Sequence, residues 1–137
     1  MIRRYMLDTN TVSDIVKGKS LTARAKLANL QHGEIACISA ITEAELQYGL
    51  AKTPKATVIR SVVEAFVAKI QVLPWGREEA LAYGAFRAKQ EAAGKPIGNL
   101  DMLIAAHAIS VGAVLVTNDK ALLRIADPPT VNWSTEL

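Results

Sequence analysis

Short apolar runs alternate along the chain with longer segments in which apolar residues recur at helical spacing. The short runs predict strands at residues 2–7, 34–38, 70–73, 113–117 and 131–133. The longer segments, counted with their capping residues, predict helices at residues 11–18, 20–30, 39–49, 54–69, 77–93 and 99–111, and a short helix after residue 119. Buried strands separated by helices are typical of an α/β domain with a mainly parallel sheet.

Residues that favour helix N-termini stand at several of the predicted starts. Thr11, with Asp14 three residues later, resembles a capping box, and Ser39 and Asn99 are good N-cap residues. We therefore expect Thr11 to cap the first helix and to leave the carboxylate of Asp8 free.

The composition indicates one compact domain. The 137 residues are 50% hydrophobic and 21% charged, which fits a single folded unit over residues 1–137 and argues against disorder. The net charge of +3 permits a nucleic-acid partner without requiring one. Because aromatic residues make up only 5% of the chain, we expect a nucleic acid to be held mainly by charge rather than by base stacking.

The cysteine and histidine content excludes several kinds of site. Cys37 is the only cysteine, so no internal disulfide can form, and its apolar neighbours predict a core position. His32 and His107 are the only histidines, so no metal site can be built from Cys and His alone. No stretch has the length of a signal-peptide core or of a membrane span, so we expect a cytoplasmic protein without membrane contact.

Two acidic residues stand just after predicted strands. Asp8 follows the strand at residues 2–7, and Asp119 follows the strand at residues 113–117. Ligands of open α/β sheets bind at the carboxyl ends of the strands, so both carboxylates are placed where a site would form. Each also has an ordinary explanation as a turn or N-cap residue, and for either residue alone both explanations stay open.

The third predicted helix carries a glutamate that we expect to face the same place. Its predicted inward stripe is Ile41, Ala44 and Tyr48. By its spacing from that stripe Glu45 faces inward, whereas Glu43 points outward. The alternative is that Glu45 lies at the edge of the stripe with its carboxylate in water.

Asp101 stands in the first turn of the helix predicted at residues 99–111. It shares a face with the inward stripe of Ile104, Ala105 and Ala108. The alternative is that Asp101 only complements the positive end of the helix dipole, which is typically worth about 0.3–1 kcal/mol.

Several carboxylates brought to one place repel one another and raise each other's pKa. Without a cluster of His or Cys, the counter-ion that suits such a set is a hard, oxygen-seeking cation, Mg²⁺ or Mn²⁺. Carboxylate-held ions of this kind activate water and stabilise the oxygens of a phosphodiester during hydrolysis. The sequence therefore predicts a metal-dependent nuclease, with basic residues outside the site holding the substrate backbone.

Four sequence blocks together resemble a known family. They are Asp8-Thr9-Asn10, Ser39-x-x-Thr42-x-x-Glu45-Leu46-x-x-Gly49, Pro96-Ile97-Gly98-x-x-Asp101-x-x-Ile104-Ala105-Ala106-His107-Ala108, and Val116-Thr117-Asn118-Asp119. In this order, from about residue 6 to residue 133, they are similar to the PIN domain. Specifically, they resemble the VapC toxins of bacterial VapBC toxin–antitoxin pairs.

The resemblance implies a three-layer α/β/α fold and an endoribonuclease that depends on Mg²⁺ or Mn²⁺. The family's acidic cluster falls on Asp8, Glu45, Asp101 and Asp119. The residues matching further family positions near the site are Asn10, Thr42, Thr117 and the basic residue Arg87. The resemblance also implies homodimers and inhibition by a cognate VapB-like antitoxin whose tail enters the cleft. Some relatives cut tRNA, including initiator tRNA.

Alternatives remain for two residues and for the function as a whole. Arg87 would contact RNA or pair with a carboxylate, and otherwise is a solvated helix charge. His107 is six residues after Asp101, about 120° away around the helix, so we expect a packed or surface histidine rather than a metal ligand. A DNA-directed nuclease and a non-catalytic nucleic-acid-binding protein of the same fold are the rival functions. A receiver-like signalling domain fits poorly, because Thr9 rather than a second acid follows Asp8.

Overall fold

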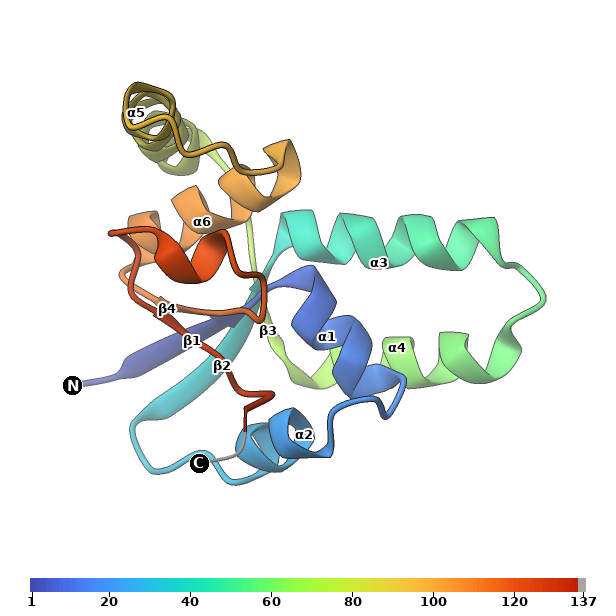
Figure 1. Cartoon of the computed structure of the whole chain (residues 1–137). Helices are drawn as coiled ribbons and strands as arrows, with labels where there is room; N and C mark the ends of the chain where they lie inside the picture. Colours follow the sequence, from blue (N-terminus) through green and yellow to red (C-terminus); the bar gives the residue numbers. More distant parts are fainter. Residues whose placement is uncertain (136–137) are drawn as a thin grey trace.

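The computed structural model describes residues 1–135. In this part of the chain, parallel strands form one sheet in the order β3-β2-β1-β4-β5 (Figure 1). The strands are β1 (Arg3–Leu7), β2 (Glu34–Ser39), β3 (Gln71–Leu73), β4 (Val114–Val116) and β5 (Thr130–Val131). β1 lies in the middle, so the residue that follows it emerges at the centre of the sheet's carboxyl edge.

Helices cover both faces of the sheet, as the parallel connections require. They are α1 (Thr9–Val16), α2 (Leu21–Ala28), α3 (Ala40–Lys52), α4 (Thr57–Lys69), α5 (Arg77–Ala92), α6 (Asn99–Val111) and the 3₁₀-helix η1 (Leu122–Arg124). α5 and α6 lie on one side, whereas α1, α2 and α4 lie on the other, and α3 and α4 extend beyond the sheet as a pair (Figure 1). The predicted three-layer α/β/α fold is confirmed.

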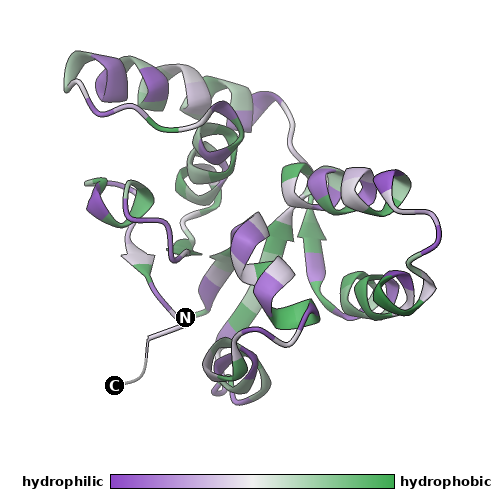
Figure 2. Cartoon of the chain, turned by 45° about the vertical axis from the view of Figure 1, so that its right-hand side comes forward, coloured by the Kyte–Doolittle hydropathy of each residue, from purple (hydrophilic) through white to green (hydrophobic). Residues whose placement is uncertain are grey.

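Two apolar cores lie on opposite faces of the sheet, because side chains alternate along a strand. Met6 and Leu115 enter the core under α5 and α6, whereas their neighbours Leu7 and Val116 enter the core under α1, α3 and α4. All four side chains are fully buried, and Cys37 is a core residue as predicted. Figure 2 accordingly shows green, hydrophobic stretches along the strands of the sheet beside purple, hydrophilic ones.

Three predicted helix starts are wrong by a few residues, each for a local reason. α1 begins at Thr9 rather than Thr11, because Asp8 takes the N-cap position. α6 begins at Asn99 rather than at Leu100, because the N-cap is Gly98 and not Asn99. The Gly98 carbonyl accepts the first helical hydrogen bond, from the amide of Met102. α4 begins at Thr57, after a turn that follows Pro54.

The other predicted elements agree with the structure to within a few residues. Ser39 caps α3 as expected. Gly112 ends α6 in the left-handed conformation (φ +66°), where its amide bonds the carbonyls of Ala108 and Ile109. Within residues 1–135, no helix is both long enough and apolar enough to cross a bilayer.

We expect truncation of Leu115 to destabilise the protein strongly. Leu115 lies fully buried in β4, so Leu115→Ala removes apolar contacts and leaves a cavity, at a cost of about 2–5 kcal/mol. Leu81→Ala is the matched control, because Leu81 on α5 is 67% exposed and its loss should cost about 0.5 kcal/mol or less. Urea unfolding measures both, and equal losses would contradict the assigned core.

Candidate functional site

Asp8 is placed by the end of β1 and the start of α1. Its backbone is extended (φ −75°, ψ 170°), and its Oδ1 accepts the Thr11 amide at 2.9 Å, so it is the N-cap of α1. The side chain is only 2% exposed. The expectation that Thr11 would cap the helix and leave Asp8 free is therefore wrong, although the second carboxylate oxygen is not used by this bond.

Glu45 reaches the site from α3. The Thr9 hydroxyl donates a hydrogen bond to its Oε1 at 2.6 Å, across the gap between α1 and α3. The buried stripe of α3 is Thr42, Leu46 and Leu50 rather than the predicted one, since Ala44 and Tyr48 are exposed. Glu45 lies beside this buried stripe, and it, not Glu43, is the glutamate that contacts α1.

Asp101 is half-buried in the first turn of α6. Its Oδ2 borders Gly98, where an added Cβ would lie 3.6 Å away. Burial raises the pKa of Asp101 to about 6, helped by the negative charges of Asp8, Asp119 and Glu45 in that order. Since charge effects fall off with distance, the four predicted acids are gathered at one place.

Asp119 follows β4 and begins the turn into η1. Its Oδ1 accepts the amides of Ala121 at 2.9 Å and Leu122 at 3.0 Å, while its own amide donates to the Thr117 hydroxyl. Its charge also helps to raise the pKa of Asp8, although burial is the main cause of that rise. Asp119 therefore has the predicted role of a turn residue before η1, whose N-cap is Ala121, and its part in a metal site stays a prediction.

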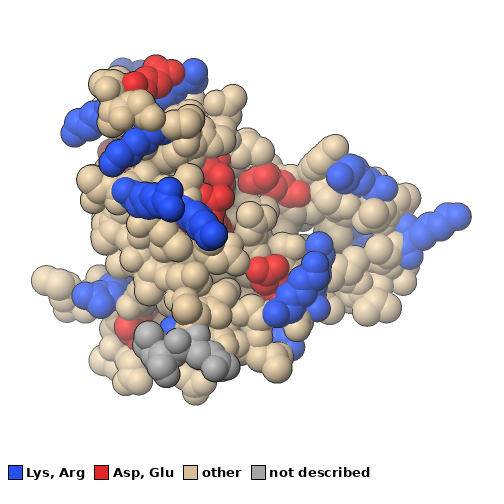
Figure 3. All heavy atoms as spheres, in the orientation of Figure 1, with Lys and Arg blue, Asp and Glu red and all other residues tan. Residues whose placement is uncertain are grey.

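Two of the acids, Glu45 and Asp101, line an open hollow of about 360 Å³ between α1, α3 and α6. Its lining residues are Thr9, Asn10, Glu45, Gly98, Asn99, Leu100 and Asp101. Figure 3 shows acidic side chains gathered at the middle of this face, with Lys and Arg side chains around them. An anionic polymer could thus be held by the surrounding positive charges while the acids face its backbone.

The carboxylates do not yet form a closed metal shell. Among residues 1–135, no three Asp, Glu, His or Cys side chains stand close enough together to hold a metal ion as they are. Two of the acids already accept hydrogen bonds from the protein. Glu45 accepts one from the Thr9 hydroxyl, and Asp119 accepts two from the amides of Ala121 and Leu122. The donor set still suits a hard divalent cation, because it consists of carboxylate oxygens and its crowding raises the pKa of Asp101.

The smaller predicted residues take different places around the acids. Thr42 is fully buried, with its hydroxyl 3.3 Å from that of Thr9. Thr117 is also fully buried, and its hydroxyl lowers the pKa of Asp8 against the effect of burial. Asn10 is exposed on the rim of the hollow.

Arg87 does not contact the acidic site. Its guanidinium donates to the Tyr83 hydroxyl at 2.9 Å and pairs with Glu91 at 3.4 Å on the exposed face of α5. It lines a separate hollow of about 520 Å³, which shares Asn99 with the rim of the acidic hollow. A contact with bound RNA therefore stays a prediction, and the carboxylate pairing is with Glu91 of its own helix.

Two polar contacts near the site do not follow from the sequence. The pattern predicts Thr9 as a turn residue that, like Thr11, could cap the first helix, whereas its hydroxyl donates to Glu45. His107 is fully buried, as a packed histidine should be, and its Nδ1 lies 2.8 Å from the Ser39 hydroxyl. In each contact the two residues are more than thirty positions apart in the sequence. The one local sign of such a contact is a polar residue on a helix face that is predicted to be buried.

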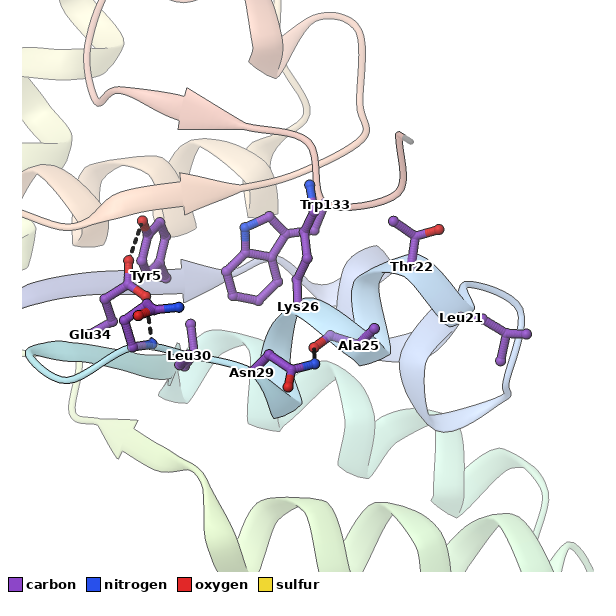
Figure 4. Close-up of a pocket in the computed structure, with 10 residues that line it drawn as sticks. Tyr5, Leu21, Thr22, Ala25, Lys26, Asn29, Leu30, Glu34 and Trp133 are labelled. Carbon is purple, nitrogen blue, oxygen red and sulfur yellow. Dashed lines mark hydrogen bonds between the residues drawn. The ribbon is translucent and has the colours of Figure 1, made fainter. Parts of the chain in front are cut away.

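Another hollow lies away from the acids. It measures about 680 Å³ and is lined by residues of α2 together with Tyr5, Glu34 and Trp133, as Figure 4 shows. The Tyr5 hydroxyl donates to Glu34 there, and the Tyr5 and Trp133 rings pack at 5.3 Å between centroids. This hollow has no cluster of acids, so it is not the site predicted from the sequence.

The PIN-domain family model matches residues 5–128 of the chain. The chain belongs to the PIN-domain family. The tRNA(fMet)-specific endonuclease VapC of Shigella flexneri is 36% identical over 132 residues, covering 96% of this PIN domain chain and 98% of the relative. Ribonuclease VapC2 of Haemophilus influenzae is 36% identical over 131 residues, with coverage of 95% and 98%.

A solved structure supports the same family assignment. VapBC2 from Rickettsia felis, bound to a DNA fragment from its promoter, contains a chain 34% identical to this PIN domain, with a TM-score of 0.87 and coverage of 95% and 98%. The predicted resemblance to VapC ribonucleases is therefore confirmed over nearly the whole chain. This PIN domain is a ribonuclease of the VapC group.

We expect neutralisation of Asp101 to stabilise the metal-free PIN domain at neutral pH. The folded-state pKa of about 6 lies above the ordinary 3.8, so the ionised carboxylate opposes folding above pH 6. This cost disappears as the pH falls through 6 towards 3.8, where the folded state binds the extra proton. Asp101→Asn should thus add on the order of 1 kcal/mol at pH 7.5, after allowance for solvent screening, and little at pH 4.5.

Urea unfolding in EDTA at the two pH values measures this effect. Glu64→Gln is the control, because Glu64 is exposed on α4 and away from the acidic site. A gain from Asp101→Asn that is the same at both pH values would show that charge crowding does not raise this pKa.

Proposed function

We propose that this PIN domain, acting as one unit over residues 1–137, is an endoribonuclease that needs Mg²⁺ or Mn²⁺ to hydrolyse RNA phosphodiester bonds. The observation that carries the proposal is that the structure places carboxylates from separate segments around the carboxyl edge of the sheet, where the charges of Asp8, Asp119 and Glu45 add to burial in raising the pKa of Asp101. Crowded carboxylates are costly without a cation, and a cation among them serves phosphodiester hydrolysis.

Each acid has a distinct part in the proposed chemistry. Asp8, Glu45 and Asp101 would hold the essential ion, and Asp119 would support it or a second one. The bound ion supplies an activated water and stabilises charge on the phosphodiester. Thr9 orients the Glu45 carboxylate, and Thr42 and Thr117 support the polar shell around it and around Asp8. Within residues 1–135, no Ser, Cys, Lys or His side chain lines the hollow, and the one hydroxyl there, that of Thr9, holds Glu45, so direct hydrolysis is expected.

The substrate is proposed to be structured RNA, and specifically tRNA. Support comes from the Shigella flexneri relative, whose name describes a tRNA(fMet)-specific endonuclease. Few aromatic side chains are available for stacking, so Lys and Arg around the acidic hollow would hold the phosphate backbone. Binding should therefore weaken steeply as salt is added. Arg87 is a candidate for this backbone contact.

The partners are proposed from the same relatives. The Rickettsia felis structure is a VapBC complex, which supports a VapB-like antitoxin that neutralises this chain. A homodimer and a cytoplasmic site of action complete the proposal, since cellular tRNA is found there.

The glutamate assignment can be tested with two neutral substitutions on one helix. Glu45→Gln should lower RNA cleavage by about 100-fold or more, because it removes a charge that would hold the ion. Glu43→Gln on the same helix should change cleavage by less than about twofold, because Glu43 does not contact the site. Cleavage of labelled tRNA under single-turnover conditions separates the two, and similar losses would refute the assignment of Glu45.

Metal dependence and substrate class can be tested together. Cleavage of initiator tRNA by the wild-type protein should stop in EDTA and return with added Mg²⁺ or Mn²⁺, and Asp101→Asn should stay inactive throughout. Cleavage that survives both changes would disprove the metal mechanism. Preferential cutting of single-stranded DNA over tRNA in the same assay would favour the DNA-directed alternative.

A further inference from the structure

A buried hydrogen bond links the start of α3 to α6. Ser39 ends β2 and caps α3, and its hydroxyl lies 2.8 Å from Nδ1 of His107, in the middle of α6. Both side chains are fully buried. Among the hydrogen bonds of residues 1–135, this is the side-chain bond that joins these two elements.

The Ser39 hydroxyl accepts the Ile41 amide at 3.0 Å, and its own proton is available to the imidazole. With Nδ1 as the acceptor of that proton, both ends of the Ser39 hydroxyl are satisfied and the ring proton lies on Nε2. We adopt this tautomer. Burial also lowers the pKa of His107, with Glu79 opposing the effect, so the neutral ring is favoured.

Nε2 of His107 has no hydrogen-bond partner in the described part of the chain. An unpaired buried donor is unfavourable, so an apolar side chain of similar size would suit this position better if packing were its only role. The feature that an apolar side chain cannot supply is the acceptor for Ser39. The histidine is thus explained by the bond that Nδ1 makes rather than by the core around it.

The two ends of this bond belong to the elements that carry two of the acids. α3 presents Glu45 six residues after Ser39, and α6 presents Asp101 six residues before His107. Six residues of α-helix span about 9 Å, so the contact between Ser39 and His107 lies close to both acids along their helices and restrains the separation of the two helix segments that carry them. Neither Ser39 nor His107 lines the acidic hollow.

We propose that His107 is a positioning residue, which acts through Ser39 to hold α3 against α6 at the spacing that lets Glu45 and Asp101 share one divalent cation. The proposal rests on the proposed metal-dependent function and adds to it a residue that never touches metal or RNA. Loss of the acceptor should weaken cation binding even where the fold is kept.

The test separates the acceptor from the packing role with two substitutions. His107→Leu keeps bulk and removes both the acceptor and the unpaired donor, so it should fold stably yet bind Mn²⁺ about tenfold more weakly. His107→Asn places an amide oxygen near the position of Nδ1, so it should leave a cavity and lower the melting temperature, yet keep Mn²⁺ affinity within about threefold of wild type. Calorimetric titration of the RNA-free protein with Mn²⁺, alongside thermal unfolding, gives both readouts.

Matched variants sharpen the result. Ser110→Ala is the control, because the Ser110 hydroxyl ties α6 to Glu79 of α5 and not to α3, so Mn²⁺ affinity should not change. Ser39→Ala should weaken Mn²⁺ binding as His107→Leu does, and the double variant should bind no more weakly than either single one. This second variant decides the question if His107→Leu does not fold.

Each possible outcome has a definite meaning. Unchanged affinity in His107→Leu, or equal weakening in His107→Leu and His107→Asn, would overturn the positioning role while leaving the proposed function intact. If the wild-type protein binds no Mn²⁺, and Asp101→Asn behaves identically, the proposed metal mechanism fails and the positioning role fails with it.

Discussion

Repulsion among the four carboxylates is the interaction on which the arrangement of this site depends. Each acid comes from a different segment, and the parallel sheet brings these segments to one edge. Three of the acids accept hydrogen bonds from the protein. The Thr11 amide donates to Asp8, the Thr9 hydroxyl donates to Glu45, and two amides at the start of η1 donate to Asp119. Asp101 has no such donor opposing the rise of its pKa, which reaches about 6. Crowding and burial therefore make the ionised form of Asp101 unfavourable.

The scaffold has to withstand this repulsion without moving the acids apart. β1 is the central strand, and its alternating side chains anchor it in both cores at once. Asp8 follows β1 directly, so the most buried acid is attached to the most constrained strand. Glu45 and Asp101 stand instead on helices, and their separation depends on how those helices pack. This difference gives the buried contact between Ser39 and His107 its importance.

The fold and two of the acids could be predicted because they follow from local periodicity. Strand ends are visible in sequence, so the places of Asp8 and Asp119 were predicted correctly. Glu45 was chosen over Glu43 from a stripe that the structure does not bear out, because Tyr48 is exposed on the arm that α3 forms with α4. The choice still agreed with the structure, since Glu45 is also next to the true buried stripe.

The remaining features could not be predicted because they depend on contacts between distant segments or on competition between local groups. The Asp8 carboxylate competes with the hydroxyl of Thr11 for the N-cap of α1, and sequence rules alone do not decide which one wins. Burial of His107 follows from its helix face, but its partner is 68 positions away and becomes a neighbour only when α6 packs against the end of β2. A capping serine and a core histidine each look ordinary by themselves.

The donors that make the metal-free site tolerable also orient two of its acids. Thr9 holds Glu45 with a short hydrogen bond, and the amides of η1 hold one oxygen of Asp119, so these two carboxylates are oriented before any cation arrives. Orientation by the protein lowers the cost of ordering these carboxylates later. The pKa of Asp101 is raised by burial and by the charges of the other three acids, so a cation beside it would relieve an unfavourable charge. The spacing between α6 and α3 then decides whether Glu45 can share that cation.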